Sequence, residues 1–276
     1  MTGRAPGAAA PGPLLDWRRA TVLGAAEFDV ARDLLDLGRG PAVLGVLSPG
    51  PTDVERAGVV RAATRSLAAR GLLGAGGFRS ALVDDLRTVV APEFQHDLVV
   101  SPPTAQQALV GYRSGRAVLA TRIGDDVALL RVPPEQAAAA LVELLGPLAR
   151  GPGPTVRIPA RVLTGAAAAA AGDRTRWVAE LLRRGCSGAE AELVARMGDL
   201  RGLAQLGAGR SGPGGHRAPA VLLVHVTAQG CYYQRRPTPA VIGGPPPDGA
   251  TVQAGPADAA TLVAELTALT ALTPPG

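Results

Sequence analysis

The pattern of apolar and polar positions predicts a strand, a tight turn, a second strand and a helix between Gly111 and Pro147. Residues 116–123 and 127–132 are apolar and rich in branched side chains, and Gly124-Asp125-Asp126 between them suits a short reversal. Pro134 is favourable in the first turn of the helix that follows. One apolar stripe of this helix contains Ala137, Leu141, Leu144 and Leu145.

A weaker form of the same pattern recurs near the C-terminus. Residues 221–226 and 231–235 are predicted strands around Ala228-Gln229-Gly230, and a helix is predicted within residues 257–269. Short matches occur in the same order in both halves of the chain: Arg70-Gly71 with Arg184-Gly185, Asp85-Leu86-Arg87 with Asp199-Leu200-Arg201, and Leu141-Val142 with Leu262-Val263. Their order and spacing predict an internal duplication.

The rest of the chain alternates helices with short strands. Capping boxes at Thr52/Glu55 and Ser187/Glu190 predict helices that run to Arg70 and to about Leu206. Further helices are predicted at 25–37, 78–90, 134–145, 160–171 and 174–184, strands at 41–47, 98–101 and 155–158, and loops at 71–77, 207–215 and 243–249. Strands joined by hairpins, with helices grouped around them, indicate an α+β fold and not a doubly wound sheet.

Stretches rich in glycine and proline mark the expected boundaries between the parts of the chain. Residues 1–13 are rich in Pro, Gly and Ala, and we expect residues 1–19 to be a disordered N-terminal segment. Gly151-Pro152-Gly153-Pro154 is the predicted junction between an N-terminal half, residues 20–150, and a C-terminal half, residues 151–276. The halves together are expected to make one domain.

Composition narrows the function classes. All 28 basic residues are Arg, so the chain has no lysine for a phosphate loop or a Schiff base. The net charge is +5, but the arginines are scattered and aromatic residues make up only 3%, so we do not expect nucleic-acid binding. Cys186 and Cys231 suit two reduced thiols, with a disulfide left open. Charged residues after Arg18-Arg19 argue against an export signal, and no apolar run reaches membrane-spanning length, so a cytoplasmic protein is expected.

Candidate chemistry is sparse. His225 alternates with valines on a predicted strand, where a structural role is favoured over a catalytic one, and His96 and His216 belong to no recognised motif. Ser114 lacks the spacing of a nucleophile elbow. The glycines of residues 71–77 join two predicted helices and do not follow a strand, which argues against a phosphate loop. We therefore predict no enzyme, no metal and no cofactor.

Two groups of residues could instead form a binding surface. Tyr232, Tyr233, Arg235 and Arg236 end a predicted strand, where aromatic and Arg side chains can anchor a partner, although one tyrosine could equally point inward. Leu200, Leu203 and Leu206 have helical spacing and could face either a docked helix or the core. A position facing the core is favoured.

The order of several short motifs resembles the EspG family of chaperones associated with type VII secretion. These motifs are Glu27-Phe28, LLDLGRGPAVL at 34–44, Gly50-Pro51-Thr52, Leu67–Leu72, AVLATRIGDDVALLRV at 117–132, Leu141–Leu145 and TVRIPARVL at 155–163. The similarity covers most of residues 20–165 and, more loosely, the C-terminal half. Family members often carry a Leu-Trp pair soon after Glu-Phe, where this chain has Val30-Ala31 and Leu34-Leu35.

The resemblance implies a central antiparallel sheet, two flanking helical bundles and a pseudo-two-fold relation between the halves. It also implies a cytosolic chaperone that holds the apolar helical tip of PE–PPE-like substrates before export, without a cofactor. On this basis the expected partner contacts are Leu200, Leu203, Tyr232 and Arg235. Two rival classes stay open, a scaffold or regulatory module of the same secretion cluster and a hydrolase or transferase, and a homodimer is also open.

Overall fold

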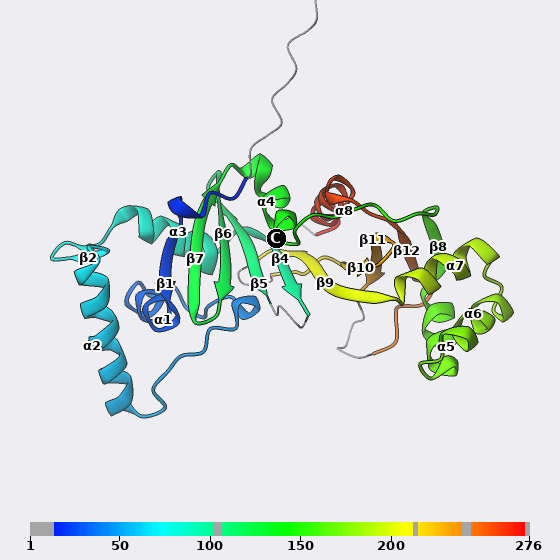
Figure 1. Ribbon diagram of the computed structural model, residues 1–276. Coiled ribbons are helices and arrows are strands. Elements are labelled where there is room, and N and C mark those ends of the chain that lie inside the picture. Colours follow the sequence, from blue (N-terminus) through cyan, green and yellow to red (C-terminus); the bar gives the residue numbers. More distant parts are fainter. Residues whose placement is uncertain (1–13, 102–105, 212–214, 239–243, 274–276) are drawn as a thin grey trace, which may run out of the picture.

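A computed structural model describes residues 14–101, 106–211, 215–238 and 244–273 (Figure 1). In these residues ten strands form one antiparallel sheet. In chain order they are β1 (Thr21–Gly24), β4 (Phe94–Val100), β5 (Gln107–Arg113), β6 (Arg116–Ile123), β7 (Asp126–Val132), β8 (Val156–Pro159), β9 (Leu200–Gly209), β10 (Ala220–Thr227), β11 (Gly230–Pro237) and β12 (Thr251–Pro256). β2 (Leu73–Gly74) and β3 (Gly77–Phe78) pair in a separate small hairpin. The α+β class and the antiparallel sheet are confirmed.

Helices cover parts of both faces of the sheet. The helices are α1 (Ala25–Leu34), α2 (Asp53–Ala69), α3 (Ser80–Val90), α4 (Ala137–Glu143), α5 (Ala160–Ala170), α6 (Arg174–Arg183), α7 (Gly188–Met197) and α8 (Ala259–Ala271). Short 3-10 helices lie at η1 (Trp17–Arg19), η2 (Ala42–Leu44) and η3 (Pro134–Gln136). Both predicted capping boxes are present, at the starts of α2 and α7.

The strand order across the sheet is β1-β7-β6-β5-β4-β9-β10-β11-β12-β8. β4 and β9 are antiparallel neighbours at the centre, with Leu98 opposite Leu206. Outward from this pair, the strands of each half follow in the same chain order, and the first strand of each half lies at an edge. The central pair therefore joins residues about a hundred positions apart into one continuous sheet.

The two faces of the sheet are covered differently. α4 and α8 lie side by side over one face, where they bury Leu98, Leu119, Leu206 and Leu222 in a core shared by both halves. On the other face, α1 and α3 cover the strands of the N-terminal half, and α5, α6 and α7 form a packed group over β8, β12 and β11. Figure 1 shows α4 and α8 above the sheet, with the other helices at its two ends.

Several sequence predictions differ from the structure. Residues 41–47 are not a strand; they form η2 and a loop in which only Leu44 is buried, because the glycine and proline residues around them interrupt regular pairing. The helix that starts after Ser187 ends at Met197, and residues 200–209 form β9. Within the segment expected to be disordered, residues 17–19 form η1 and the Leu14 amide donates to Glu143 Oε2 at 3.1 Å; residues 1–13 lie outside the described residues.

The sequence matches between the halves also need correction. Arg70-Gly71 and Arg184-Gly185 end α2 and α6, and Leu141 and Leu262 are both buried in the helices α4 and α8. Asp85-Leu86-Arg87, however, lies within α3, whereas Asp199-Leu200-Arg201 leads into β9. By position in the sheet, the partner of the 116–132 hairpin is β11–β12, one strand later than the 221–235 hairpin that the sequence pattern suggested.

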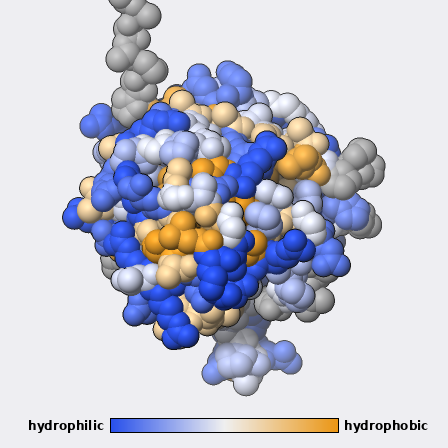
Figure 2. Space-filling view, turned by 90° about the vertical axis from the view of Figure 1, so that its right-hand side faces the viewer, coloured by the Kyte–Doolittle hydropathy of each residue, from blue (hydrophilic) through white to orange (hydrophobic). Residues whose placement is uncertain are grey.

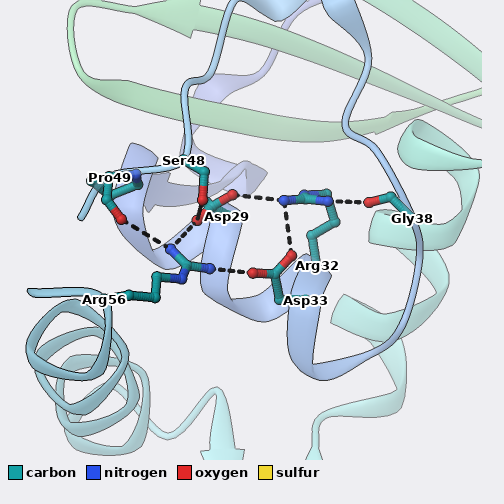
Figure 3. Close-up of polar contacts among 7 residues, drawn as sticks. All are labelled: Asp29, Arg32, Asp33, Gly38, Ser48, Pro49 and Arg56. Carbon is teal, nitrogen blue, oxygen red and sulfur yellow. Dashed lines mark hydrogen bonds and ion pairs between the residues drawn. The ribbon is translucent and has the colours of Figure 1, made fainter. Parts of the chain in front are cut away.

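A polar cluster holds the long helix α2 against α1 (Figure 3). Asp29 is buried and accepts hydrogen bonds from Arg32 at 2.7 Å, from Ser48 at 3.1 Å and from Arg56 of α2. Arg56 also pairs with Asp33. Burial alone would raise the pKa of Asp29, but these hydrogen bonds outweigh it and hold the pKa below its usual value. The carboxylate thus stays charged and ties together α1, α2 and the intervening loop.

Candidate partner-binding surface

On one face of the sheet, part of the central strands lies outside the packed cores of the described residues. On β9, Ala204 and Leu206 point to the core under α4 and α8, so Leu203 and Gln205 point to the opposite side. β10 alternates in the same way: Leu222 is fully buried in that core, whereas Leu223 is only half-buried. Side-chain alternation therefore brings an aliphatic row to the side away from the helix pair.

We call this surface the open face and define it by Val99 of β4, Leu203 and Gln205 of β9, and Val221 and Leu223 of β10. Val99, Gln205 and Leu223 are neighbours in one row across the three strands. The four aliphatic residues are half-buried, Gln205 is exposed, and none belongs to a packed apolar cluster of the described residues. A row of aliphatic side chains outside the packed cores is the kind of surface that a partner can bury.

Elements on either side limit the open face. Toward the N-terminal half, Arg122 donates to the Gly45 carbonyl oxygen at 2.6 Å and fixes the loop after η2 beside β5. Toward the C-terminal half, the end of α7 covers β10 and β11: the His225 ring nitrogen Nδ1 lies 3.3 Å from the Met197 carbonyl oxygen, and Tyr232 packs on Met197. The open face is consequently a strip about three strands wide between two helical groups.

One ion pair lies at the margin of the strip. Asp97 is 4% exposed, and Arg217 binds both of its carboxylate oxygens, with one contact at 3.0 Å. A Cβ at Gly207 would stand 2.8 Å from the Asp97 Oδ1 atom and closer still to Arg217, so the glycine leaves room for this pair. Because Arg217 already binds it, the Asp97 carboxylate is not free for another cation.

The four partner contacts expected from the sequence lie in two different parts of the structure. Leu200 begins β9 and is 48% exposed, and Leu203 belongs to the open face, so these two lie on one strand. Tyr232 has no exposed surface, and its ring lies against Gly151, where any added Cβ would clash. Arg235 is on the side of α8, 3.1 Å from Glu265. Tyr232 is thus enclosed, and Arg235 lies on the sheet face that α8 covers, away from the strip.

Two hollows lie near helices of the C-terminal half. One of about 260 Å³, between α5 and α6, is lined mainly by Ala167, Ala170, Trp177 and Gly198, and it adjoins the turn from α7 into β9. Figure 2 looks onto this end of the molecule and shows apolar side chains in patches among hydrophilic ones. A larger hollow of about 750 Å³ lies along the seam between α4 and α8, on the other side of the sheet, and is lined in part by Val263.

The two buried histidines, His96 and His225, have structural surroundings. His96 lies between Tyr112, at 3.0 Å, and Thr270 of α8, at 2.9 Å, and burial lowers its pKa to about 4. Burial likewise lowers the pKa of His225 to about 4. The described part of the chain contains no group of three His, Cys, Asp or Glu side chains that could hold a metal ion. Among its helices, none is both long and apolar enough to cross a bilayer.

The family model described as the EspG family matches residues 24–268 of this chain. The chain belongs to the EspG family. A solved structure with the same fold is the type VII secretion system chaperone EspG5 of Mycobacterium tuberculosis in complex with the PE25–PPE41 dimer. Its TM-score is 0.74 at 14% sequence identity, and the match covers 93% of this chain and 98% of that one. No curated protein matches this EspG chain in sequence.

Proposed function

We propose that this EspG chain is a type VII secretion chaperone that binds the apolar helical tip of a PE–PPE-like pair, keeps the pair soluble and directs it for export. The observation that carries the proposal is the open face, an aliphatic strip on the central strands that belongs to none of the packed apolar clusters among the described residues. Support also comes from the similar fold of EspG5, whose structure is that of a complex with PE25–PPE41.

The size of the open face suits reversible binding. Full burial of an aliphatic side chain stabilises a complex by about 1.5–3 kcal/mol, so half-buried residues can contribute about 1 kcal/mol each. Val99, Leu203, Val221 and Leu223 would together supply only part of a strong interaction, which the exposed Leu200 can extend along β9. A chaperone that must release its substrate for export needs such moderate affinity.

This binding mode needs no cofactor and no catalytic group, in keeping with a chaperone role. The half-buried Leu203 and exposed Leu200 stay in the proposed contact, and Leu223 and Val221 join them. Tyr232 and Arg235 act beneath the surface and on the other face, where they hold strands and helices in place. We place this activity in the cytoplasm, where substrates wait before export.

We also propose that residues 20–150 and 151–276 are diverged copies of one unit, flanked by helical bundles. The identical strand order outward from β4 and β9 supports this relation, as do the equivalent ends of α2 and α6. In such an arrangement the open face lies near the pseudo-two-fold axis, between the helices of the two copies.

The test is co-expression with PE–PPE-like pairs encoded by the genome of the same organism. We expect at least one pair to become soluble and to co-purify with the wild-type chain as a ternary complex. Leu223→Asp should weaken that complex at least 10-fold, because it places a charge in the apolar strip. Val263→Asp is the control on the opposite face, since this half-buried residue lies at the hollow between α4 and α8, where it packs on the core.

Thermal unfolding of each variant separates lost binding from lost folding. Pairs that are fully soluble without the chain, or that never co-purify with it, would contradict the chaperone proposal and favour a scaffold or regulatory module of the same secretion cluster. Equal weakening by both substitutions would contradict the assignment to the open face.

A further inference from the structure

Two adjacent arginines on β11 point to opposite faces of the sheet. Arg235 is half-buried and contacts Glu265 of α8 and Gln253 of β12, both at 3.1 Å. Arg236 is exposed and lies opposite Val221 of β10, on the same side as the open face. Strand alternation thus gives one arginine a structural partner and presents the other beside the aliphatic strip.

None of the carboxylates that the structure describes pairs with Arg236. Among the described residues it takes part in no ion pair, and Asp97, the carboxylate at the margin of the open face, is already bound by Arg217. The stretches outside the described residues contain no Asp or Glu at all. Burial is the main cause that lowers the pKa of His225 to about 4, and the charge of Arg236 adds to it.

The spacing suits a helical partner. Val221 and Leu223 are two residues apart on β10, or about 7 Å along the strand. Side chains one turn apart on a helix surface are about 5–6 Å apart. A tip that packs an aliphatic residue on Leu223 can therefore bring a side chain of the next turn to Arg236, which stands opposite Val221.

We propose that Arg236 pairs with a carboxylate carried by the partner's tip, about one helical turn from the aliphatic residue that contacts Leu223. This inference rests on the proposed chaperone function and adds a selection rule to it. Tips that combine aliphatic and acidic residues are accepted, and tips with a basic residue in that place are rejected, because like charges at an interface are strongly unfavourable.

The experiment uses the PE–PPE-like pair that co-purifies with the wild-type chain. Affinity is measured for wild type, Arg236→Gln, Arg236→Glu and Arg65→Glu. Arg65 is an exposed arginine of α2, so its reversal changes the net charge equally at a distant place. We expect a loss of about 3- to 10-fold for Arg236→Gln and more than about 10-fold for Arg236→Glu. The Arg65→Glu value should stay within about 2-fold of wild type.

A charge exchange completes the test. Replacing the Asp or Glu residues of the partner's tip by Arg, one at a time, should restore binding to Arg236→Glu in one case. Equal affinities for Arg236→Glu and Arg65→Glu, with wild type still forming the complex, would overturn the selection rule alone. A wild-type chain that recovers no pair would overturn the chaperone function and this inference with it.

Discussion

Substituting Asp29 tests how the long helix α2 is held in place. The Asp29 side chain is 3% exposed and accepts from Arg32, Arg56 and Ser48, whereas Asp33, which shares Arg56, is 45% exposed. Asp29→Asn keeps the shape of the side chain and removes its charge. Asp33→Asn makes the same chemical change at the exposed end of the cluster. The two variants therefore differ mainly in burial.

The structure sets the size of the expected effect. Breaking a buried ion pair costs about 3–5 kcal/mol, but Arg32 and Arg56 are themselves 15% and 22% exposed and can recover some hydration. We expect Asp29→Asn to cost about 2–3 kcal/mol, which lowers Tm by about 5–10 °C in a chain of this size. For Asp33→Asn we expect no more than about 0.5 kcal/mol, as for an exposed pair.

Thermal unfolding followed by circular dichroism at neutral pH measures both shifts. The hydrogen bonds that lower the pKa of Asp29 stabilise the fold above the unfolded-state pKa, and this stabilisation is lost as the pH falls through the lowered value. The difference between wild type and Asp29→Asn should therefore shrink in strong acid. Equal Tm shifts for the two variants, or shifts below about 1 °C for both, would refute the view that this buried carboxylate fastens α2 to α1.

Two further predictions concern stability. Burial lowers the pKa of His96 and His225 to about 4, below the value of about 6.5 in the unfolded chain. The free energy of unfolding should therefore fall as the pH drops from about 6.5 to 4, by up to about 1.4 kcal/mol per histidine and pH unit. Urea unfolding at several pH values should show a weaker dependence of this free energy on pH for His225→Gln than for wild type, and an unchanged dependence would contradict the prediction. Gly111→Ala places a Cβ 2.1 Å from the Thr88 carbonyl oxygen and should cost at least about 2–3 kcal/mol, whereas Gly58→Ala in α2 meets no atom and should stabilise by up to about 1 kcal/mol; melting curves that shift both variants in the same direction would contradict the packing of α3 on β5.

Local chemistry made much of the fold predictable from the sequence. The hairpin at 116–132 and the helix after Pro134 follow from alternation and turn residues that agree with one another. The capping boxes at Thr52 and Ser187 place the starts of α2 and α7 correctly, because a cap depends only on residues within one turn.

The end of α7 could not be predicted in the same way. Leu200, Leu203 and Leu206 have helical spacing by coincidence, and the residues between them, Arg201, Gly202, Ala204 and Gln205, carry little hydrophobic signal. In the structure, the pairing of β9 with both β4 and β10 decides the conformation. Those partners are distant in sequence, so local periodicity gives no information about them.

The candidate site depended on the same long-range pairing. The apolar run at 221–226 predicts a strand, but only the placement of α8 and α7 shows that Leu222 is enclosed and Leu223 is not. Arg235 and Arg236 are likewise equivalent in sequence until the register of β11 assigns each to a face. An aromatic residue such as Tyr232 can anchor a partner, but this side chain is fully buried against α7 and Gly151.

A photo-crosslinking side chain at position 205 tests the central claim most directly. Gln205 is exposed in the middle of the open face, so replacing it by a benzophenone amino acid leaves the core untouched. With the co-purified PE–PPE-like pair, we expect irradiation to join this position to the helical tip of the pair. Crosslinks to the tip from position 263, beside α4, and none from position 205 would contradict binding at the open face.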